Sequence, residues 1–130
     1  MKHYNVVAAV VCHDGKYLCM QKGKTKFEYT SYKWEFPGGK IEPGETPQQA
    51  LTRELMEEME YPVEVEEELV TVNHEYPDFS ITMTAFLCTP KGDADGFKRR
   101  EHADSKWCSK DELKGLNWAA ADIDVVEGIL

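Results

Sequence analysis

The hydrophobic pattern at the start of the chain predicts a β-hairpin followed by a short strand. Residues 6–12 form an uninterrupted run of valine, alanine and cysteine, which is typical of a strand buried on both faces. Asp14-Gly15 supplies turn chemistry, and residues 16–20 form the apolar return strand. Residues 34–36 predict another short strand, which ends at Pro37.

The spacing of apolar residues then changes to that of a helix, over roughly residues 47–60. Residues 38–44 precede it as an irregular loop, because their glycines permit backbone conformations that are closed to other residues. Thr46 is a good N-cap, with Pro47 in the first helical position and Gln49 completing a capping-box pattern. The apolar residues at helical spacing are Ala50, Leu51, Leu55 and Met59. The pattern therefore predicts an amphipathic helix entered from a tight loop.

The middle of the chain predicts further strands. Residues 63–73 and 80–89 are β-rich runs with partial apolar and polar alternation, joined by a turn at residues 75–78. Residues 90–104 are polar and contain glycine, which indicates an exposed loop. Residues 105–108 predict one more strand.

Two helical signals close the chain. Ser109 and Glu112 form a second capping-box pattern for a short helix, and residues 119–129 predict a terminal helix. The apolar side of that helix carries Ile123, Val126 and Ile129. Because no repeat or linker divides the 130 residues, we expect one domain over residues 1–130 that mixes strands and helices.

Charge and cysteine content narrow the class of protein. The chain has 15 Lys and Arg against 24 Asp and Glu, a formal net charge of -9. That sign repels polyanions, so we expect no nucleic-acid or membrane binding as the main role. Cys12, Cys19, Cys88 and Cys108 show no metal-binding spacing, which suggests reduced thiols. The N-terminus has no signal-peptide core and no run reaches membrane-spanning length, so we expect a cytoplasmic monomer or homodimer.

Residues 22–33 are the basic, aromatic segment of an otherwise acidic chain. The basic residues are Lys22, Lys24, Lys26 and Lys33, and the aromatic ones include Phe27, Tyr29 and Tyr32. This composition makes the segment, and Lys22 in particular, a candidate for substrate binding. The alternative for any one of these residues is a solvated surface loop.

A cluster of carboxylates on the predicted long helix is the strongest chemical signal. Glu54, Glu57 and Glu58 are related as i, i+3 and i+4, which places them on one face. Such a cluster repels itself unless the face binds a hard cation, and Mg²⁺ commonly lies between protein carboxylates and substrate phosphates. Arg53 can pair with Glu45, Glu57 or both through its planar guanidinium, which suggests an orienting role. The alternative is a solvated acidic helix, against which the glycine loop weighs.

These residues match the signature of the Nudix hydrolase family. Its fixed positions are occupied by Gly39, Glu45, Arg53, Glu54, Glu57 and Glu58, with Leu55 at its apolar place. The chain departs from the signature at Glu60, where the family has a glycine that eases the chain out of the helix. Residues 34–42 resemble a segment of MutT-type nucleoside triphosphate pyrophosphohydrolases, and residues 120–123 are similar to the bacterial CTP pyrophosphohydrolase branch. The resemblance therefore covers nearly the whole chain.

The resemblance implies an α/β fold of the α+β type, with a mixed β-sheet sandwiched between helices. The implied ligands of Mg²⁺, for which Mn²⁺ can substitute, are the Gly39 carbonyl oxygen and the carboxylates of Glu54, Glu57 and Glu58. Water would attack the β-phosphorus of a nucleoside triphosphate, giving the monophosphate and pyrophosphate. The implied substrates are modified or oxidised nucleotides, such as 8-oxo-dGTP, or CTP and dCTP.

Three alternatives stay open for the function. The substrate could be another nucleoside diphosphate-X compound, such as a nucleotide sugar or a dinucleotide. The chain could also be a Nudix-fold module that binds a nucleotide without cleaving it. The last alternative is an acidic surface that binds metal and no nucleotide.

A further acid is implied outside the helix. Glu101 matches the place at which MutT-like enzymes bring an acid from a late loop, as an extra metal ligand or helper base. Its alternative is an ion pair with Arg99 or Arg100. The candidate catalytic residues are thus Arg53, Glu54, Glu57, Glu58 and Glu101.

Base recognition is implied for residues outside the signature. By resemblance, Phe36 would lie beside the base and Asp122 would read it. An ionised Asp only accepts hydrogen bonds, so it would suit an exocyclic amino group, while the alternative is an N-cap of the last helix. Asp78 also matches a substrate-side position, although Pro-Asp is common turn chemistry and a turn is expected. Trp118 is expected to pack in the core or rim and to border the base pocket.

Overall fold

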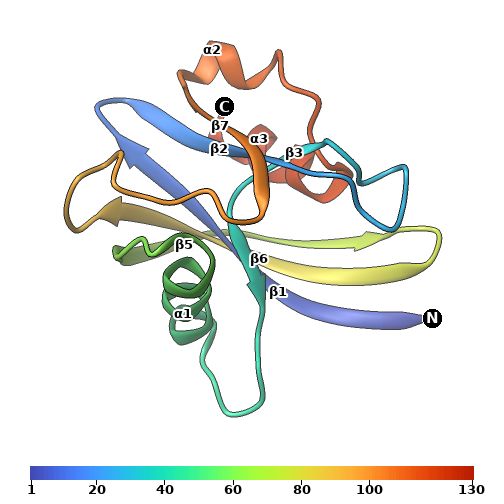
Figure 1. The fold of residues 1–130 in the computed structure, drawn as a ribbon. Coiled ribbons are helices and arrows are strands. Elements are labelled where there is room, and N and C mark those ends of the chain that lie inside the picture. Colours follow the sequence, from blue (N-terminus) through green and yellow to red (C-terminus); the bar gives the residue numbers. More distant parts are fainter.

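The strand β1 (Lys2–His13) lies at the centre of a 7-stranded mixed sheet. The computed structural model describes residues 1–130. β1 pairs in parallel with β6 (Phe79–Pro90) and antiparallel with β2 (Lys16–Lys22) and β4 (Gly38–Lys40). The remaining strands are β3 (Trp34–Glu35), β5 (Val63–Glu75) and β7 (His102–Cys108). The strand order is β3-β2-β1-β6-β5, with β7 beside β2 (Figure 1).

The apolar run of β1 is buried on both faces, as its composition predicts. Residues 7–11 are at most 2% exposed. Successive side chains enter two hydrophobic cores, with Val7, Ala9 and Val11 in one and Ala8 and Val10 in the other. β1 therefore separates the cores against which the helices pack.

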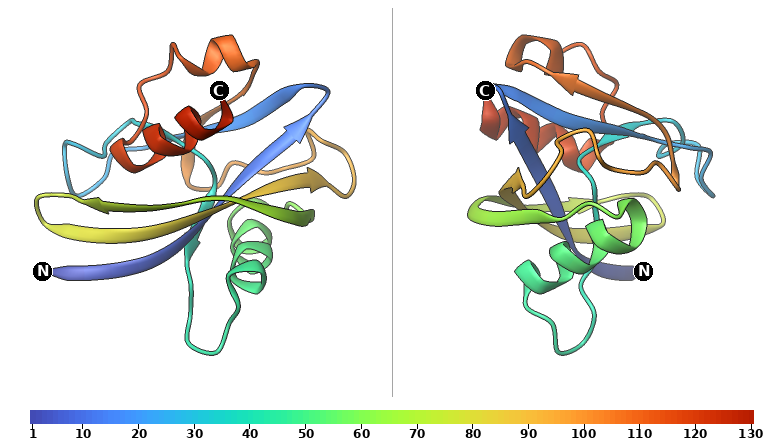
Figure 2. Two further views of the ribbon diagram at one scale, coloured as in Figure 1. Left: turned by 180° about the vertical axis from the view of Figure 1, so that it is seen from behind. Right: turned by 60° about the vertical axis from the view of Figure 1, so that its left-hand side comes forward.

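Helices cover both sides of the strands. α1 (Pro47–Met59) contributes its buried face to one core, and α3 (Ala120–Ile129) contributes Val125 and Val126 to the other. The short helix α2 (Lys110–Leu113) follows β7. α1 and α3 lie on opposite sides of β5 and β6 (Figure 2). This arrangement confirms the expected α/β fold, in which a mixed sheet lies between helices.

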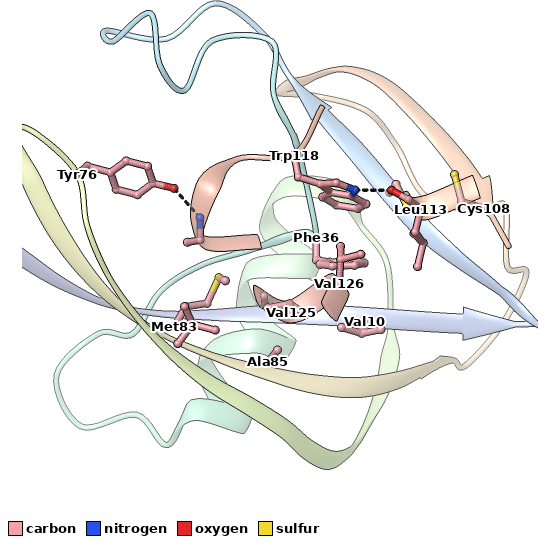
Figure 3. Close-up of a cluster of buried hydrophobic side chains, with 14 residues drawn as sticks. Val10, Phe36, Tyr76, Met83, Ala85, Cys108, Leu113, Trp118, Val125 and Val126 are labelled. Carbon is pink, nitrogen blue, oxygen red and sulfur yellow. Dashed lines mark hydrogen bonds between the residues drawn. The ribbon is translucent and has the colours of Figure 1, made fainter. Parts of the chain in front are cut away.

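The core beneath α3 fixes where that helix begins. The rings of Phe36 and Trp118 are stacked with 4.8 Å between their centroids (Figure 3). The indole N–H of Trp118 donates to the Leu113 carbonyl oxygen at 2.7 Å. The backbone N–H of Ala121 donates to the Tyr76 hydroxyl at 3.1 Å. Both bonds are made at the start of α3, so they attach it to α2 and to the end of β5.

Both predicted capping boxes are present. In α1 the Thr46 hydroxyl accepts from the Gln49 N–H at 3.1 Å, and the Gln49 side chain accepts from the Thr46 N–H at 3.0 Å. Ser109 and Glu112 make the same reciprocal contacts at the start of α2. The local sequence therefore decides where these helices start.

The glycines expected to form a loop instead form strand β4. Gly38 pairs with Ala8 and Gly39 pairs with Val7. A Cβ on Gly38 would clash with the carbonyl oxygen of Val7, so this glycine permits the close approach of two strands. The left-handed conformation that a tight turn requires occurs further on, at Gly44, where φ is 85°.

The ends of the chain's later elements also differ from the predictions. On α3, Ile123 is 43% exposed while Val125 is 1% exposed, so the buried face is turned relative to the predicted one. β7 begins at His102, ahead of the predicted residues 105–108, because residues 102–104 pair with β2. Backbone pairing with a neighbour decides this strand, and apolar alternation does not mark it.

Two simpler expectations are met. The hairpin turn between β1 and β2 has positive φ at both Asp14 (51°) and Gly15 (74°), the conformation that favours Asp-Gly. All the cysteines are free thiols.

None of the helices combines the length and the apolar character needed to cross a bilayer.

Candidate active site

Arg53 joins α1 to the loop that precedes it. Its Nε and a terminal nitrogen donate to the two carboxylate oxygens of Glu45, at 2.6 and 2.9 Å. This two-point contact holds the pKa of Glu45 below its usual range, and the Glu42 backbone N–H, which donates to the same carboxylate at 2.9 Å, adds to the effect. Arg53 also donates to the Lys40 carbonyl oxygen at 3.0 Å, which attaches α1 to β4.

The other terminal nitrogen of Arg53 reaches the carboxylates of α1. It donates to Glu54 at 2.9 Å and to Glu57 at 3.1 Å. The hydrogen bonds to Glu45 and then to Glu54 outweigh burial and raise the pKa of Arg53, so the guanidinium stays charged. The geometry supports the orienting role expected for Arg53, because most of its contacts are with carboxylates of the site.

Gly39 leaves the space that the Glu54 carboxylate occupies. A Cβ on Gly39 would clash with the carboxylate carbon and Oε2 of Glu54. The glycine of β4 and the glutamate of α1 are therefore in direct contact, although they belong to different elements. Their contact brings the Gly39 backbone beside a carboxylate, as the expected metal site requires.

Glu58 and Glu101 lie close together at the same face. Glu58 is half-buried, and burial, followed by the negative charges of Glu101 and Glu54, raises its pKa to about 8. Glu101 belongs to the loop before β7, so the fold brings it to the helix from the far part of the sequence. The charges that act on Glu58 are those of other carboxylates, so this face is acidic.

These donors fit a hard divalent cation. Oxygen ligands of carboxylates and carbonyls are those that Mg²⁺ prefers. No three or more acidic, histidine or cysteine side chains converge on one point as a closed cage. Mg²⁺ commonly takes only one or two protein carboxylates and completes its shell with water and substrate phosphates, so an open carboxylate face suits it.

One pocket of about 1150 Å³ extends from this face into the space between the sheet and the loop of residues 22–33. The predicted site residues that line it are Lys22, Phe36, Gly39, Glu58, Asp78, Glu101 and Asp122. Arg53, Glu54 and Glu57 lie outside its lining and act on it through their neighbours. The pocket therefore brings the carboxylates into one space with the residues expected to read the base.

Asp122 lines the same pocket from the first turn of α3. It is 5% exposed, and its Oδ1 accepts from the backbone N–H of Phe36 at 3.0 Å. The N-cap of α3 is Ala119, so the N-cap alternative for Asp122 is wrong. Burial, followed by the charge of Glu35, raises the pKa of Asp122 to about 8. The hydrogen bond from the Phe36 N–H and the charge of Lys22 act in the opposite direction and lower this pKa. The net rise in pKa favours the protonated form of Asp122 over the ionised acceptor that the resemblance implies.

Glu35 and His102 are pocket residues that the sequence interpretation missed. Glu35 lies 3.5 Å from the Lys22 ammonium and 3.0 Å from Nε2 of His102. Nδ1 of His102 is buried and has no hydrogen-bond partner. An acid between Trp34 and Phe36, in a short apolar strand, was the available signal for Glu35. His102 carried no such signal, because only its pairing with β2 places it in the pocket.

The loop of residues 22–33 packs on the β5–β6 hairpin through aromatic rings. Phe27 stacks on Tyr29 and Phe79, with centroids 5.1 and 5.7 Å apart, and Tyr29 stacks on Tyr76 at 5.7 Å. The Tyr29 hydroxyl donates to Asp78 at 2.8 Å. The solvated-loop alternative is therefore wrong for Phe27 and Tyr29. Asp78 lies in the predicted turn and also holds this loop in place.

Phe36 and Trp118 pack against each other, as the expected core position of Trp118 requires. Phe36 is 2% exposed and its ring stacks on Trp118, so it offers little surface to the pocket. Trp118 does not line this pocket. Further aromatic lining comes from β1, the loop and the hairpin, through Tyr4, Phe27, Tyr76 and Phe79.

Glu60, the departure from the signature, keeps the helix geometry that a glycine would provide. It ends α1 in the left-handed conformation, with φ 48° and ψ 42°. Its N–H donates to the Met56 carbonyl oxygen at 3.0 Å, and the Tyr61 N–H donates to that of Leu55 at 3.2 Å. A residue in the left-handed conformation at the end of a helix is what a glycine typically provides. The helix exit is therefore preserved, at the cost of a conformation that glycine adopts more easily.

Comparison with known proteins agrees with this geometry. The NUDIX domain model matches residues 1–127. A protein of Escherichia coli (strain K12) named CTP pyrophosphohydrolase is 35% identical over 131 residues, which cover 100% of this chain and 93% of the relative. A protein of Proteus vulgaris named 8-oxo-dGTP diphosphatase is 41% identical over 88 residues, which cover 68% of this chain and 78% of the relative.

A solved structure is similar over nearly the same length. The solution NMR structure of the DNA mismatch repair protein MutT (family Nudix hydrolase) from methicillin-resistant Staphylococcus aureus 252 superposes with a TM-score of 0.73 and 38% sequence identity. The superposition covers 99% of this chain and 97% of that chain. On these matches and on the carboxylate helix, the chain belongs to the Nudix hydrolase family.

Proposed function

We propose that the chain, acting as one domain of residues 1–130, hydrolyses nucleoside triphosphates to nucleoside monophosphates and pyrophosphate with the help of Mg²⁺. The observation that carries the proposal is that one pocket is lined by Glu58 and Glu101, from α1 and the loop before β7, and by Asp122 from α3. We place the polyphosphate of a nucleotide at the carboxylates, which form the phosphate end, and its base at Asp122. The carboxylate end needs a cation to receive the phosphates, since both are anionic.

The residues that would hold the metal are the Gly39 carbonyl oxygen and the carboxylates of Glu54, Glu57, Glu58 and Glu101. A bound Mg²⁺ or Mn²⁺ would neutralise phosphate charge and lower the pKa of a water ligand. Arg53 fixes the carboxylates of Glu54 and Glu57 through its contacts at 2.9 and 3.1 Å. Gly39 leaves room for the Glu54 carboxylate to stay against β4.

The proposed reaction is a displacement at the β-phosphorus, with water as the nucleophile. The oxygen of water forms a bond to the β-phosphorus. The bond between the β-phosphorus and the oxygen that bridges the α- and β-phosphates breaks. The nucleoside monophosphate leaves with the electron pair, and pyrophosphate carries the oxygen of the water. The water's proton passes to a carboxylate, for which Glu101 and Glu58 are the candidates because both line the phosphate end.

The substrates we propose are modified or oxidised nucleotides such as 8-oxo-dGTP, or CTP and dCTP. The names of the relatives from Proteus vulgaris and Escherichia coli support this range. A protonated Asp122 can donate one hydrogen bond and accept others, so it can bind a base edge that presents a carbonyl oxygen beside an N–H. Lys22, beside Glu35, adds a cation at the same end of the pocket.

The test is pyrophosphate release from a panel of modified and unmodified NTPs and dNTPs in the presence of Mg²⁺. In water labelled with ¹⁸O, the label is expected in pyrophosphate; label in the monophosphate would place the attack at the α-phosphorus. Glu57→Gln and Glu58→Gln should each lower kcat by about 100-fold or more while the protein stays folded. Glu64→Gln is the control, because Glu64 is exposed on β5 and pairs only with Lys91 at 3.7 Å.

Other outcomes distinguish the remaining functions. Release of a monophosphate from a nucleotide sugar or a dinucleotide, and not from triphosphates, would assign another nucleoside diphosphate-X substrate. Nucleotide binding with Mg²⁺ but no product from any compound would assign a binding module. Calorimetry in which a nucleotide adds nothing to Mg²⁺ binding would leave only an acidic metal-binding surface.

A further inference from the structure

Glu60 forms ion pairs with the loop that precedes β7. Its carboxylate lies 3.0 Å from the Lys98 ammonium and also accepts from the guanidinium of Arg100. The carboxylate of Glu60 therefore lies between two cations of this loop. The residue that replaces the glycine of the family signature thus has partners of its own.

The same stretch of loop is also bound to the backbone at the end of α1. The N–H of Lys98 donates to the Met59 carbonyl oxygen at 2.8 Å. The guanidinium of Arg100 donates to the Glu57 carbonyl oxygen at 3.2 Å. Residues 98–100 therefore lie along the C-terminal turn of α1, and the next residue in the chain is Glu101.

The position of Glu101 needs such support. Residues 96–101 belong to no helix or strand, since β7 begins only at His102. Glu101 lines the pocket together with Glu58, and no helix or strand fixes its position there. The contacts of Lys98 and Arg100 with the end of α1 are what fix the preceding part of the loop.

We propose that Glu60 is a positioning residue, which holds Glu101 beside Glu58 by binding Lys98 and Arg100. A glycine at this position would end the helix equally well but would have no side chain to bind the loop. The proposal rests on the proposed function, in which Glu101 takes part in hydrolysis. It gives the departure from the signature a role in the site that the signature describes.

The test is a double-mutant cycle between Glu60→Gly and Glu101→Gln, with kcat and KM measured for the best triphosphate of the panel. Glu60→Gly should lower kcat about tenfold, the lower range for loss of a group that orients a ligand, and should leave KM nearly unchanged. Its Tm should be unchanged or higher, because glycine adopts the left-handed conformation more easily. In the Glu101→Gln background, Glu60→Gly should have no further effect on kcat.

The outcomes separate this proposal from the proposed function. If Glu60→Gly lowers kcat equally in both backgrounds, or leaves the wild-type kcat unchanged while Glu101→Gln lowers it, the positioning role is overturned and the function stands. If Glu101→Gln itself has wild-type kcat, the role of Glu101 in the proposed function is overturned together with the positioning role.

Two further variants complete the design. Lys98→Gln combined with Arg100→Gln removes the partners of Glu60 and leaves the cap of α1 intact, so it should reproduce the loss of kcat. The fold should persist in all these variants, because Tyr61 still holds the earlier part of the loop through Phe97, 5.4 Å between ring centroids, and the Ala94 carbonyl oxygen at 2.7 Å. Glu64→Gln, which breaks only the exposed pair with Lys91, should keep wild-type kcat.

Discussion

Arg53 and Glu45 form a two-point ion pair, with nitrogen to oxygen distances of 2.6 and 2.9 Å. The pair is largely shielded from water, since the two side chains are 21% and 18% exposed. A third nitrogen of the same guanidinium remains free to reach the carboxylates of Glu54 and Glu57. One planar group thus sets the relative positions of the loop, the strand β4 and the acidic face of α1.

Replacing the planar guanidinium of Arg53 by the ammonium group of a lysine tests the orienting role of Arg53. Arg53→Lys keeps the positive charge but cannot contact Glu45, Glu54 and Glu57 at once. We expect kcat to fall by about 10- to 100-fold and the Mg²⁺ concentration needed for half-maximal activity to rise, because the carboxylates lose their orientation. Steady-state kinetics over a Mg²⁺ titration measures both. A variant with wild-type kcat would show that charge alone is sufficient.

The adjacent glycines of β4 should respond differently to the same substitution. Gly38→Ala places a methyl group against the Val7 backbone, which cannot move aside without breaking the pairing with β1, so we expect a loss of about 3 kcal/mol or more in unfolding free energy. Gly39→Ala meets only the end of the Glu54 side chain, which can swing away, so we expect about 1 kcal/mol or less.

The activity of the glycine variants should be measured separately from their stability. Gly39→Ala should lose most of its kcat while remaining folded, because the Glu54 carboxylate is displaced from its place beside β4. Urea unfolding and pyrophosphate release measure the two properties separately. Gly92→Ala is the matched control, since a Cβ there meets nothing within 4 Å. Full activity in Gly39→Ala would mean that Glu54 does not need its observed position.

Burial of Asp122 predicts a pH-dependent contribution to stability. Its folded pKa is raised to about 8 from 3.8, so the folded state binds more protons than the unfolded state between these values. The stabilisation is fully present below about pH 4 and is lost as the pH rises through about 8. Glu35 and Lys22 face the same space, and their charges act on the pKa of Asp122 in opposite directions, Glu35 raising it and Lys22 lowering it.

Asp122→Asn isolates this contribution, because asparagine resembles the protonated acid at every pH. The unfolding free energy of the wild type should fall relative to that of Asp122→Asn between pH 4 and 8, by more than about 1.4 kcal/mol, the equivalent of one pKa unit. Urea unfolding of both proteins across this range measures the difference. A difference that does not change with pH would show that Asp122 is ionised in the folded protein.

The aromatic contact between the loop and the hairpin should affect substrate binding more than turnover. Phe27→Ala removes a ring that lines the pocket and stacks on Tyr29 and Phe79. Aromatic pairs contribute about 0.5–1.5 kcal/mol, so we expect KM to rise about 2- to 10-fold with kcat changed less. Tyr29→Phe, which removes only the bond to Asp78, is the milder companion variant. A fall in kcat with unchanged KM would contradict a binding role for this wall.

Much of the site could be predicted because it lies within one helix. The capping residues Thr46 and Gln49 define where α1 begins, and a helix places residues i, i+3 and i+4 on one face whatever surrounds it. The carboxylate face and its contact with Arg53 follow from this spacing. The buried strand β1 and the Asp-Gly turn after it could also be predicted locally. The types of residue alone indicate burial on both faces and a positive φ.

Only the tertiary structure decided how the rest of the pocket is assembled. Glu101 and Glu58 meet because the loop before β7 lies along the end of α1, and His102 meets Glu35 because β7 pairs with β2. The protonation of Asp122 depends on burial and on a neighbouring charge, which are properties of position and not of residue type. Sequence spacing determines contacts within an element, while contacts between elements and the pKa values they produce exist only once the chain has packed.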